Sequence, residues 1–377
     1  MSKWQKVKLG DICDILDSYR VPITAKNREV GIYPYYGANG IQDYVKDFIF
    51  DGDYVLVAED GGYFGSKTKP ISYKVSGKFW VNNHAHILKA KKDIFTDYLC
   101  YSTMFYDVSS LVNGATRQKL TQAALKEIKI PLPPMEEQKK IVARLDAVSD
   151  LLVKQKQLLS EQDNLIQSTF YDMFGNPIKN EKGWKFSKIS SIYKVRSSQR
   201  IHQKDLALSG IPFLRVSDLE KKINCVSPNI NLFISDEFFS ILHKNRDIPE
   251  ENDILITTRG TLGDVYIYKN NDRFYFQDGM ITWLKPNKNS IMPLFFLYLF
   301  KTCEFKNSLH KYKGGTTVAY LSIKNLSDLL IPVPPFELQQ KFAAVAEQIE
   351  SEKSKIKSAI TETQTLFNAL MAEYFEE

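Results

Sequence analysis

The sequence predicts an α+β protein with two β-rich bodies, each followed by a long α-helix, in which the two helices pack as an antiparallel coiled coil with pseudo-twofold symmetry. Three observations predict this fold class. A proline-rich motif occurs twice, each copy precedes a long heptad-patterned segment, and short β-branched or aromatic runs occupy the region before each copy. A chain of 377 residues is long enough for such a duplication.

The repeat is clearest around the prolines. IPLPPMEEQKKIVARLD starts at Ile130, and IPVPPFELQQKFAAVAE starts at Ile331. Upstream, NGATRQKLTQAALKEIKIPLPP lies over GGTTVAYLSIKNLSDLLIPVPP. Further back, GDYVLVAEDGG from Gly52 lies over NDILITTRGTLG from Asn252, and WQKVKLGDI from Trp4 lies over WKFSKISSI from Trp184. The whole chain is therefore interpreted as two tandem copies of one unit.

The bodies are predicted to be mixed. YVLVA, KFWVNNHAHILKA, DILITT, DVYIYK and GMITWLK are runs typical of strands, separated by glycine, aspartate and asparagine. In TDYLCYSTMF and PLFFLYLF the apolar residues are too dense for strand alternation, so each body is expected to contain a local helix there.

The segments after the prolines are predicted to be long helices. The first has no glycine or proline between Glu136 and Gly175, and prolines before each segment prevent an earlier helix start. Acidic Glu136 and Glu337 suit a first helical turn. Heptad spacing predicts an apolar seam, the stripe that faces the partner helix, on each helix. The first seam comprises Ile141, Leu145, Val148, Leu152, Leu159, Ile166 and Met173, and the second comprises Phe342, Ala346, Ile349, Ile356, Ile360, Phe367, Leu370 and Tyr374. The polar residues that interrupt the two seams are Gln155, Gln162, Thr169, Lys353 and Thr363.

These patterns predict four segments. The first body covers residues 1–134 and its helix 135–175; the second body covers 176–335 and its helix 336–377. A helix of about 40 residues spans roughly 60 Å and cannot bury its apolar stripe alone, so we expect the two to pack on each other. The polar interruptions would reduce stability but specify the register.

Composition narrows the classes of function. Apolar residues make up 44% and charged residues 25%, as in globular proteins, and the net charge of +6 suits a polyanionic partner. The four cysteines are far apart, which disfavours disulfides and zinc and favours a reducing cytoplasmic setting. The N-terminus lacks the pattern of a secretion signal, and the longest apolar run is too short for a membrane span.

This arrangement of two different β-rich bodies, each followed by a helix introduced by IPLPPMEEQ or IPVPPFELQ, resembles the specificity subunit of type I restriction-modification systems over essentially the whole chain. The second copy departs from the motif at Leu338, where the first has Glu137. The resemblance implies a non-catalytic subunit whose bodies each recognise half of a split site in double-stranded DNA. It also implies docking of two modification (methyltransferase) subunits, which carry S-adenosylmethionine, and of restriction subunits.

Glycine-rich turns with basic and polar residues are the predicted DNA-binding sites, because arginine, lysine, asparagine and glutamine bond base edges and glycine allows close approach to phosphates. Solvated connections without function are the alternative interpretation. The candidates in the first body are Tyr35, Tyr36, Asn39, Tyr63, Ser66, Lys67, Lys69, Thr116, Arg117, Gln118 and Lys119. Those in the second are Arg215, Thr258, Arg259, Thr261, Lys311, Lys313, Thr316 and Thr317.

Other chemistry finds little support in the sequence. His84 and His86 alternate as in a strand, but no nearby cysteine or carboxylate group completes a metal site, so we expect no metal and no cofactor. The prolines of the two motifs stand in a different context from the (Asn or Asp)-Pro-Pro-aromatic motif of adenine methyltransferases. Two alternatives stay open: a coiled-coil scaffold whose bodies bind protein, and an enzyme with an unfamiliar site.

Overall fold

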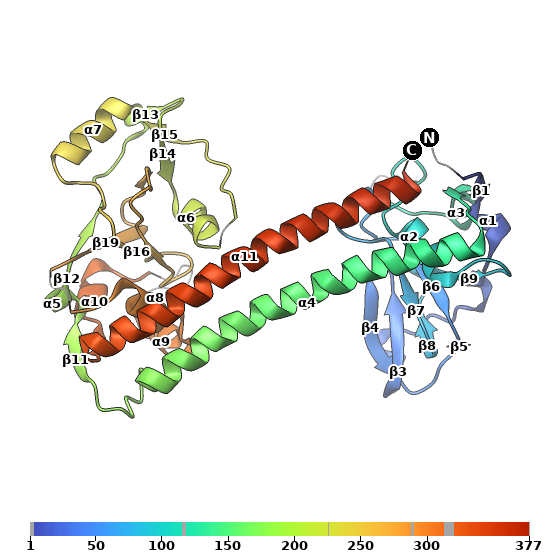
Figure 1. The fold of residues 1–377 in the computed structure, drawn as a ribbon, viewed down its shortest axis with the longest axis horizontal. Helices are drawn as coiled ribbons and strands as arrows, with labels where there is room; N and C mark the ends of the chain where they lie inside the picture. Colours follow the sequence, from blue (N-terminus) through green and yellow to red (C-terminus); the bar gives the residue numbers. More distant parts are fainter. Residues whose placement is uncertain (1–3, 115–117, 225, 288–289, 313–319, 377) are drawn as a thin grey trace. The chain divides into compact units, whose positions relative to one another are not determined.

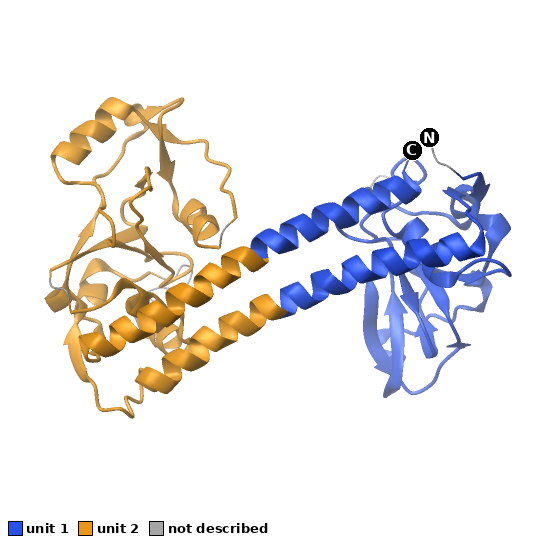
Figure 2. Cartoon of the chain, in the orientation of Figure 1, with its two compact units in different colours: residues 1–157, 357–377 blue, residues 158–356 orange. Residues whose placement is uncertain are grey.

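The structure is a computed structural model that describes residues 4–114, 118–224, 226–287, 290–312 and 320–376 (Figure 1). The chain divides into two compact units (Figure 2). Unit 1 comprises Met1–Gln157 and Lys357–Glu377, and unit 2 comprises Leu158–Ile356. Each unit therefore contains one β-rich body, one end of the first long helix and the opposite end of the second.

The two long helices begin directly after the repeated prolines. Helix α4 covers Met135–Phe174 and helix α11 covers Phe336–Phe375, each with 40 residues. Glu136 and Glu137 lie in the first turn of α4, and Glu337 lies in that of α11. The carboxylates there face the positive end of the helix dipole, as the sequence predicts.

Contacts inside each unit show that α4 and α11 run antiparallel. In unit 1, the Arg144 guanidinium donates to the Tyr374 hydroxyl at 3.0 Å, and Gln155 Nε2 donates to Thr363 Oγ1 at 3.1 Å. In unit 2, the rings of Phe170 and Phe342 lie 5.5 Å apart. Residue numbers in α11 fall as those in α4 rise, so the antiparallel pairing predicted from the sequence is confirmed.

The predicted seam residues form this interface. In unit 1, Ile141, Leu145 and Leu152 are buried in one cluster with Phe367 and Tyr374. In unit 2, the cluster contains the predicted residues Ile166, Phe342, Ala346 and Ile349, together with Phe170 and Phe174, which the heptad pattern did not predict. Burial of these apolar side chains supplies the stability that an isolated helix of this length lacks.

The described residues of the unit 1 body form three small sheets. In spatial order, they are β1 (Lys6–Lys8) with β10 (Lys129–Pro131); β2 (Cys13–Ile15), β9 (Ala85–Ala90), β6 (Tyr54–Ala58) and β7 (Ser72–Val75); and β4 (Gly40–Val45), β3 (Val30–Gly37), β8 (Lys78–Val81) and β5 (Phe50–Asp51). The helices are α1 (Leu9–Ile12), α2 (Thr96–Met104) and α3 (Gln122–Glu127), with 3₁₀ turns at Asp17–Tyr19 and Ala25–Asn27.

The body of unit 2 repeats this plan. Its sheets are β11 (Lys185–Lys188) with β20 (Leu330–Val333); β12 (Tyr193–Ser197), β19 (Ile281–Pro286), β16 (Ile254–Thr257) and β17 (Val265–Ile267); and β13 (Leu206–Ala207), β15 (Phe233–Ile234), β14 (Ile211–Leu214) and β18 (Tyr275–Phe276). The helices are α5 (Ile189–Ile192), α6 (Val216–Ile223), α7 (Asp236–Lys244), α8 (Pro293–Lys301), α9 (Cys303–Ser308) and α10 (Ile323–Asp328), with 3₁₀ turns at Gln203–Asp205 and Leu309–Tyr312.

Hydrogen bonding aligns the two bodies residue by residue. The Leu120 amide donates to the Glu59 carbonyl, and the Leu321 amide donates to the Thr258 carbonyl, each at 2.8 Å. Glu59 therefore corresponds to Thr258, whereas the ungapped sequence overlay placed Arg259 there. The overlay was wrong by one residue because β6 and β16 are buried on both faces, and such strands carry no alternating pattern that fixes their register.

The local helices predicted in the bodies are confirmed as α2 and α8. Both pack on the long helices: the Tyr101 hydroxyl of α2 donates to Asp146 at 2.7 Å, and the Tyr298 hydroxyl of α8 donates to Glu350 at 2.6 Å. Among the residues described, none of the helices is long and apolar enough to cross a membrane.

Candidate nucleic-acid interface

Three of the predicted turns of the first body lie beside one another in unit 1. The loop after β6 starts at Glu59, and its Asp60 pairs with Lys119 in an isolated antiparallel bridge. Lys119 also pairs with Asn113 through a second antiparallel bridge with two backbone hydrogen bonds. From the β3–β4 turn, Asn39 Nδ2 donates to the Gly61 carbonyl at 3.0 Å. Backbone pairing and one side chain thus gather segments that are distant in sequence.

The loop after β6 presents an exposed aromatic and basic surface. The Tyr63 side chain is 41% exposed, and Lys69 Nζ lies 4.4 Å from the centre of its ring. Lys67 is exposed as well. Ser66 has a different role, because its hydroxyl accepts hydrogen bonds from the amides of Thr68 and Lys69 and so shapes the turn.

Tyr35 and Tyr36 are not turn residues, contrary to the prediction. Both belong to β3, and the turn itself lies at Ala38 and Asn39. Tyr35 is 1% exposed, and its hydroxyl exchanges hydrogen bonds with the backbone of Ile23. Tyr36 is half-buried against the rings of Tyr73 and Phe79, and burial raises its pKa. The glycines that suggested a turn follow the tyrosines rather than surround them.

The second loop of the first body is described only at its ends. Gln118 is exposed. Lys119 is half-exposed, and its ammonium lies 2.7 Å from Glu59 Oε1. Thr116 and Arg117, which the sequence also predicts to bind DNA, lie outside the described residues.

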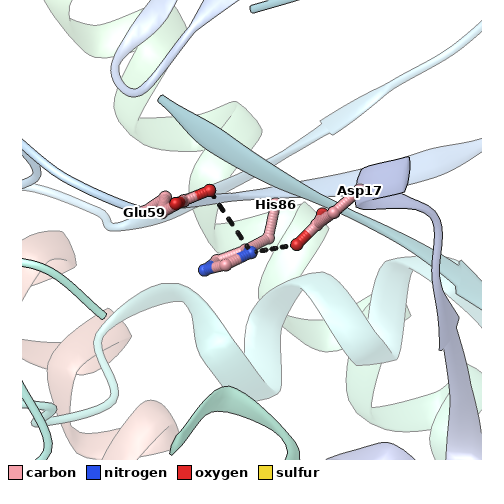
Figure 3. Close-up of side chains that lie close together, drawn as sticks. All are labelled: Asp17, Glu59 and His86. Atoms are coloured by element: carbon pink, nitrogen blue, oxygen red, sulfur yellow. Dashed lines mark hydrogen bonds and ion pairs between the residues drawn. The ribbon is translucent and has the colours of Figure 1, made fainter. Parts of the chain in front are cut away.

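A buried polar cluster supports these loops (Figure 3). Asp17 Oδ2 lies 2.6 Å from His86 Nδ1, and the other His86 nitrogen, Nε2, lies 2.8 Å from the Leu120 carbonyl. Arg20 forms an ion pair with Glu59 at 2.5 Å. Asp17 and Glu59 side chains are only 9% exposed, so their charges depend on these partners.

The ion pairs of the cluster shift its carboxyl pKa values. Burial alone would raise the pKa of Glu59, but hydrogen bonds from Lys119 and Arg20 outweigh burial and hold the pKa below its usual value of 4.5. Burial would likewise raise the pKa of Asp17, but the hydrogen bond with His86, together with the charges of His86 and Arg20, outweighs burial and holds the pKa below its usual value of 3.8. Both carboxyls are therefore ionised at neutral pH.

The cluster is chemically complete without a metal ion. Asp17, Glu59 and His86 offer ligand atoms within 4.8 Å of one another. However, the cationic side chains of Arg20 and Lys119 already bind the carboxylates, and both nitrogens of His86 face protein acceptors. A divalent cation there would displace these interactions and face two positive charges, so the residues do not fit a metal.

The matching position in unit 2 is the turn after β16. Arg259 pairs with Tyr320 in an isolated bridge that corresponds to the bridge between Asp60 and Lys119. Arg259 and Thr261 are exposed, and the Arg259 guanidinium lies 6.0 Å from the centre of the Tyr320 ring. The same backbone bridge therefore joins an acidic and a basic residue in the first body, and a basic and an aromatic residue in the second.

Thr258 does not lie on the surface, contrary to its prediction as a DNA-binding residue. The residue is 1% exposed, and its hydroxyl donates to the Met280 carbonyl at 3.1 Å. Strand β16 ends at Thr257, and the chain reaches the surface only at Arg259.

The remaining candidates of the second body are spread over other elements. Arg215 is exposed at the start of α6, where its guanidinium is 3.4 Å from both Asp218 and Asn231. Lys311 is exposed in the 3₁₀ turn Leu309–Tyr312. Lys313, Thr316 and Thr317 lie outside the described residues.

Sequence reasoning missed Asp60, Tyr320 and the buried cluster. Asp60 and Tyr320 emerge only from the pairing of Asp60 with Lys119 and of Arg259 with Tyr320. The available signal was the repeat itself, since a correct register would have aligned Asp60 with Arg259. His86 lies on a strand, as the alternation predicted, but the carboxylates of Asp17 and Glu59 lie beside it, and the sequence did not indicate them.

The comparisons of this chain with known proteins all indicate the same protein family. The family model described as the type I restriction modification DNA specificity domain matches residues 1–161 and 181–363. A Haemophilus influenzae protein named as a type I restriction enzyme specificity subunit is 29% identical over 348 residues, which cover 91% of this chain and 86% of that protein. The type I restriction enzyme MjaIX specificity subunit of Methanocaldococcus jannaschii is 25% identical and covers 74% of this chain and 68% of its own length.

The fold is also that of solved structures. A type I restriction-modification S subunit from M. genitalium aligns over 100% of this chain and 97% of its own, with a TM-score of 0.62 and 16% identity. A chain from a structural study of assembly of the type I restriction-modification system aligns over 99% and 97%, with a TM-score of 0.57 and 17% identity. The family match over both repeats, together with this fold, shows that the chain belongs to the type I restriction-modification DNA specificity subunits, the non-catalytic DNA-recognition components of these systems.

Proposed function

We propose that the chain reads a bipartite site in double-stranded DNA, with one half-site per body. In this proposal, residues 1–134 and 176–335 are the two recognition domains, and residues 135–175 and 336–377 are spacer helices. The observation that carries it is the pair of equivalent bridges, Asp60 with Lys119 and Arg259 with Tyr320. The two bodies share one backbone arrangement but carry different side chains at these loops, and such a difference would allow them to recognise two different half-sites.

The contact residues are proposed from their chemistry and, where the structure describes them, from their exposure; Thr116, Arg117, Lys313, Thr316 and Thr317 are proposed from the sequence alone. Arg259 suits the acceptor atoms of guanine in the major groove, whereas Lys67 and Lys69 suit phosphates. The proposed surface of the first body comprises Asn39, Tyr63, Lys67, Lys69, Thr116, Arg117 and Gln118, and that of the second comprises Arg215, Arg259, Thr261, Lys311, Lys313, Thr316 and Thr317. Five candidates are left out: Tyr35 and Thr258 are buried, Tyr36 packs half-buried against two rings, Ser66 shapes its own turn, and Lys119 pairs with the nearly buried carboxylate of Glu59.

The long helices are proposed as spacers. At about 1.5 Å per residue, 40 residues extend roughly 60 Å, which exceeds the 34–36 Å of one DNA turn. Helix length would then set the number of unread base pairs between the half-sites.

The helices and the proline segments are also the proposed docking surface for two modification subunits, which bring S-adenosylmethionine, and restriction subunits join that core. Large apolar side chains exposed along the helices support this: Leu151, Val153, Leu158, Leu165, Val345 and Leu366 are 41–62% exposed. A surface of this kind is typical of a protein that binds partners.

Arginine substitutions in the full complex test the two-reader proposal. The chain is co-expressed with its methyltransferase subunit, and methyladenine in the host DNA is mapped by single-molecule sequencing. Arg259→Ala should relax the base preference of one half-site, and Arg117→Ala that of the other. Equal loss of methylation at all sequences for both variants would contradict the assignment.

A further inference from the structure

The two recognition loops of the first body are tied to each other beneath the surface. Glu59 is the first residue of one loop, and Lys119 is the last residue of the other. The carboxylate of Glu59 bonds Arg20 through Oε2 at 2.5 Å and Lys119 through Oε1 at 2.7 Å. One side chain thus connects the core to both loops.

A second link runs through His86. Its Nε2 lies 2.8 Å from the carbonyl of Leu120, the residue after Lys119, and its Nδ1 lies 2.6 Å from Asp17. Asp17 in turn accepts a hydrogen bond from the Ile87 amide at 3.1 Å. The end of the second loop is therefore held on both sides, by a side chain and through its backbone.

Among the described residues of the second body, the matching positions carry no charged side chains. The strand registers place Ser197, Thr258 and Thr282 at the positions of Asp17, Glu59 and His86. Thr282 and Thr258 hydroxyls lie 3.4 Å apart, and Thr258 also donates to a carbonyl. Both bodies share the backbone bridge; ion pairs reinforce it in the first body, whereas the matching described positions of the second body hold a serine and two threonines.

From this difference we infer that Glu59 is a positioning residue for the first body, which holds the start of the loop after β6 and the neighbouring Lys119 in place without contacting DNA. The inference rests on the proposed function. Glu59 is nearly buried with Arg20, and removing one partner of such a pair leaves the other without compensation. Lys119, which the sequence predicts to contact DNA, accordingly binds Glu59 and holds the two segments together.

Charge-removing variants of the full chain, co-expressed with the methyltransferase subunit, test this inference. The matched control is Glu29→Gln, because Glu29 forms an ion pair with Lys46 at 2.8 Å in the same body, but both side chains are more than 70% exposed. The readout is the methylation rate of duplexes with one altered base in either half-site. The half-site of the first body is identified by exchanging residues 1–134.

Glu59→Gln and Lys119→Met should lower discrimination at the half-site of the first body about tenfold or more, the scale of one lost base contact, and leave the other half-site unchanged. Lys119→Arg restores the ion pair and should retain the wild-type motif. Glu29→Gln should match the wild type. If Glu59→Gln does not fold, as judged by co-purification and thermal unfolding, Asp17→Asn replaces it, with the same selective loss expected.

Two results would overturn the inference. Full discrimination in Glu59→Gln, combined with loss in Lys119→Met, would mean that Lys119 reads bases directly. Equal loss at both half-sites in Glu59→Gln would mean a general effect on the protein. A wild-type complex that methylates no split motif would instead contradict the proposed function, so the two failures are distinguishable.

Discussion

Gln138 and Gln339 make the same three hydrogen bonds in the two halves of the chain. Gln138 Oε1 accepts from the Phe95 amide, and its Nε2 donates to the carbonyls of Asp93 and Pro133. Gln339 Oε1 accepts from the Met292 amide, and its Nε2 donates to the carbonyls of Ser290 and Pro334. Each glutamine fastens the start of a long helix to the start of a body helix, which gives the repeated motif a structural reason.

Replacing either glutamine should destabilise its unit. Both side chains are at most 1% exposed, and Gln138→Met or Gln339→Met leaves backbone groups unpaired in the core. Because each such group costs about 1–3 kcal/mol, we expect a loss of about 2–4 kcal/mol in the free energy of unfolding, measured by thermal or denaturant unfolding. Gln340→Met, at the exposed neighbouring position, is the control. Equal stability of Gln339→Met and Gln340→Met would contradict the role assigned to the motif.

Removing a buried polar atom between the long helices should have the opposite effect. Gln162 Oε1 is buried without a hydrogen-bond partner among the described residues. Gln162→Leu should therefore raise the free energy of unfolding by about 1 kcal/mol, whereas Gln167→Leu at an exposed site of α4 should change it little. A lower unfolding temperature for Gln162→Leu would show that the amide stabilises the helix pair through an interaction outside this account.

The buried cluster predicts a stability difference that depends on pH. Folding lowers the pKa of Glu59 below 4.5 and that of Asp17 below 3.8, so the folded state binds fewer protons than the unfolded state. Their stabilisation is present above these values and is lost as the pH falls through the folded pKa values. The unfolding temperature of wild type should exceed that of Glu59→Gln most at neutral pH, and the difference should shrink below about pH 4.5. A constant difference from neutral to acidic pH would contradict this account.

Phosphate contacts and base contacts should respond differently to substitution. Lys67→Ala should weaken DNA binding by the complex uniformly across sequences and reduce the slope of log K against log salt by about 1, because one counterion fewer is released. Arg259→Ala should change sequence preference as well as affinity. Fluorescence anisotropy with cognate and altered duplexes over a range of salt concentrations separates the two. A sequence-dependent effect of Lys67→Ala would move that lysine among the base-reading residues.

Local signals predicted the helical half of the fold. The double prolines and the following acidic residues mark the start of each long helix, and the heptad pattern identifies residues such as Ile141 and Phe367 that are buried between the helices. These features act over a few residues, or repeat at fixed spacing, so one sequence reveals them.

The site depended on contacts that no local pattern encodes. Asp17, Glu59, His86 and Lys119 come from four distant segments, and only the folded sheet brings them together. Tyr35 and Thr258 are buried, although the glycines near them in the sequence suggested exposed turns. The sequence identifies residue types that are suited to DNA binding, but it does not show which of these side chains are buried or hydrogen-bonded inside the body.

Exchange of whole bodies tests the central claim most directly. Residues 1–134 or 176–335 are replaced with the corresponding body of a family relative of different specificity, and the chain is co-expressed with its methyltransferase subunit. Single-molecule sequencing of the host DNA then gives the methylated motif. The account predicts a split motif in which each exchange changes one half and leaves the other half intact. A motif that changes in both halves with either exchange, or an active, bound methyltransferase that methylates no split motif, would contradict it.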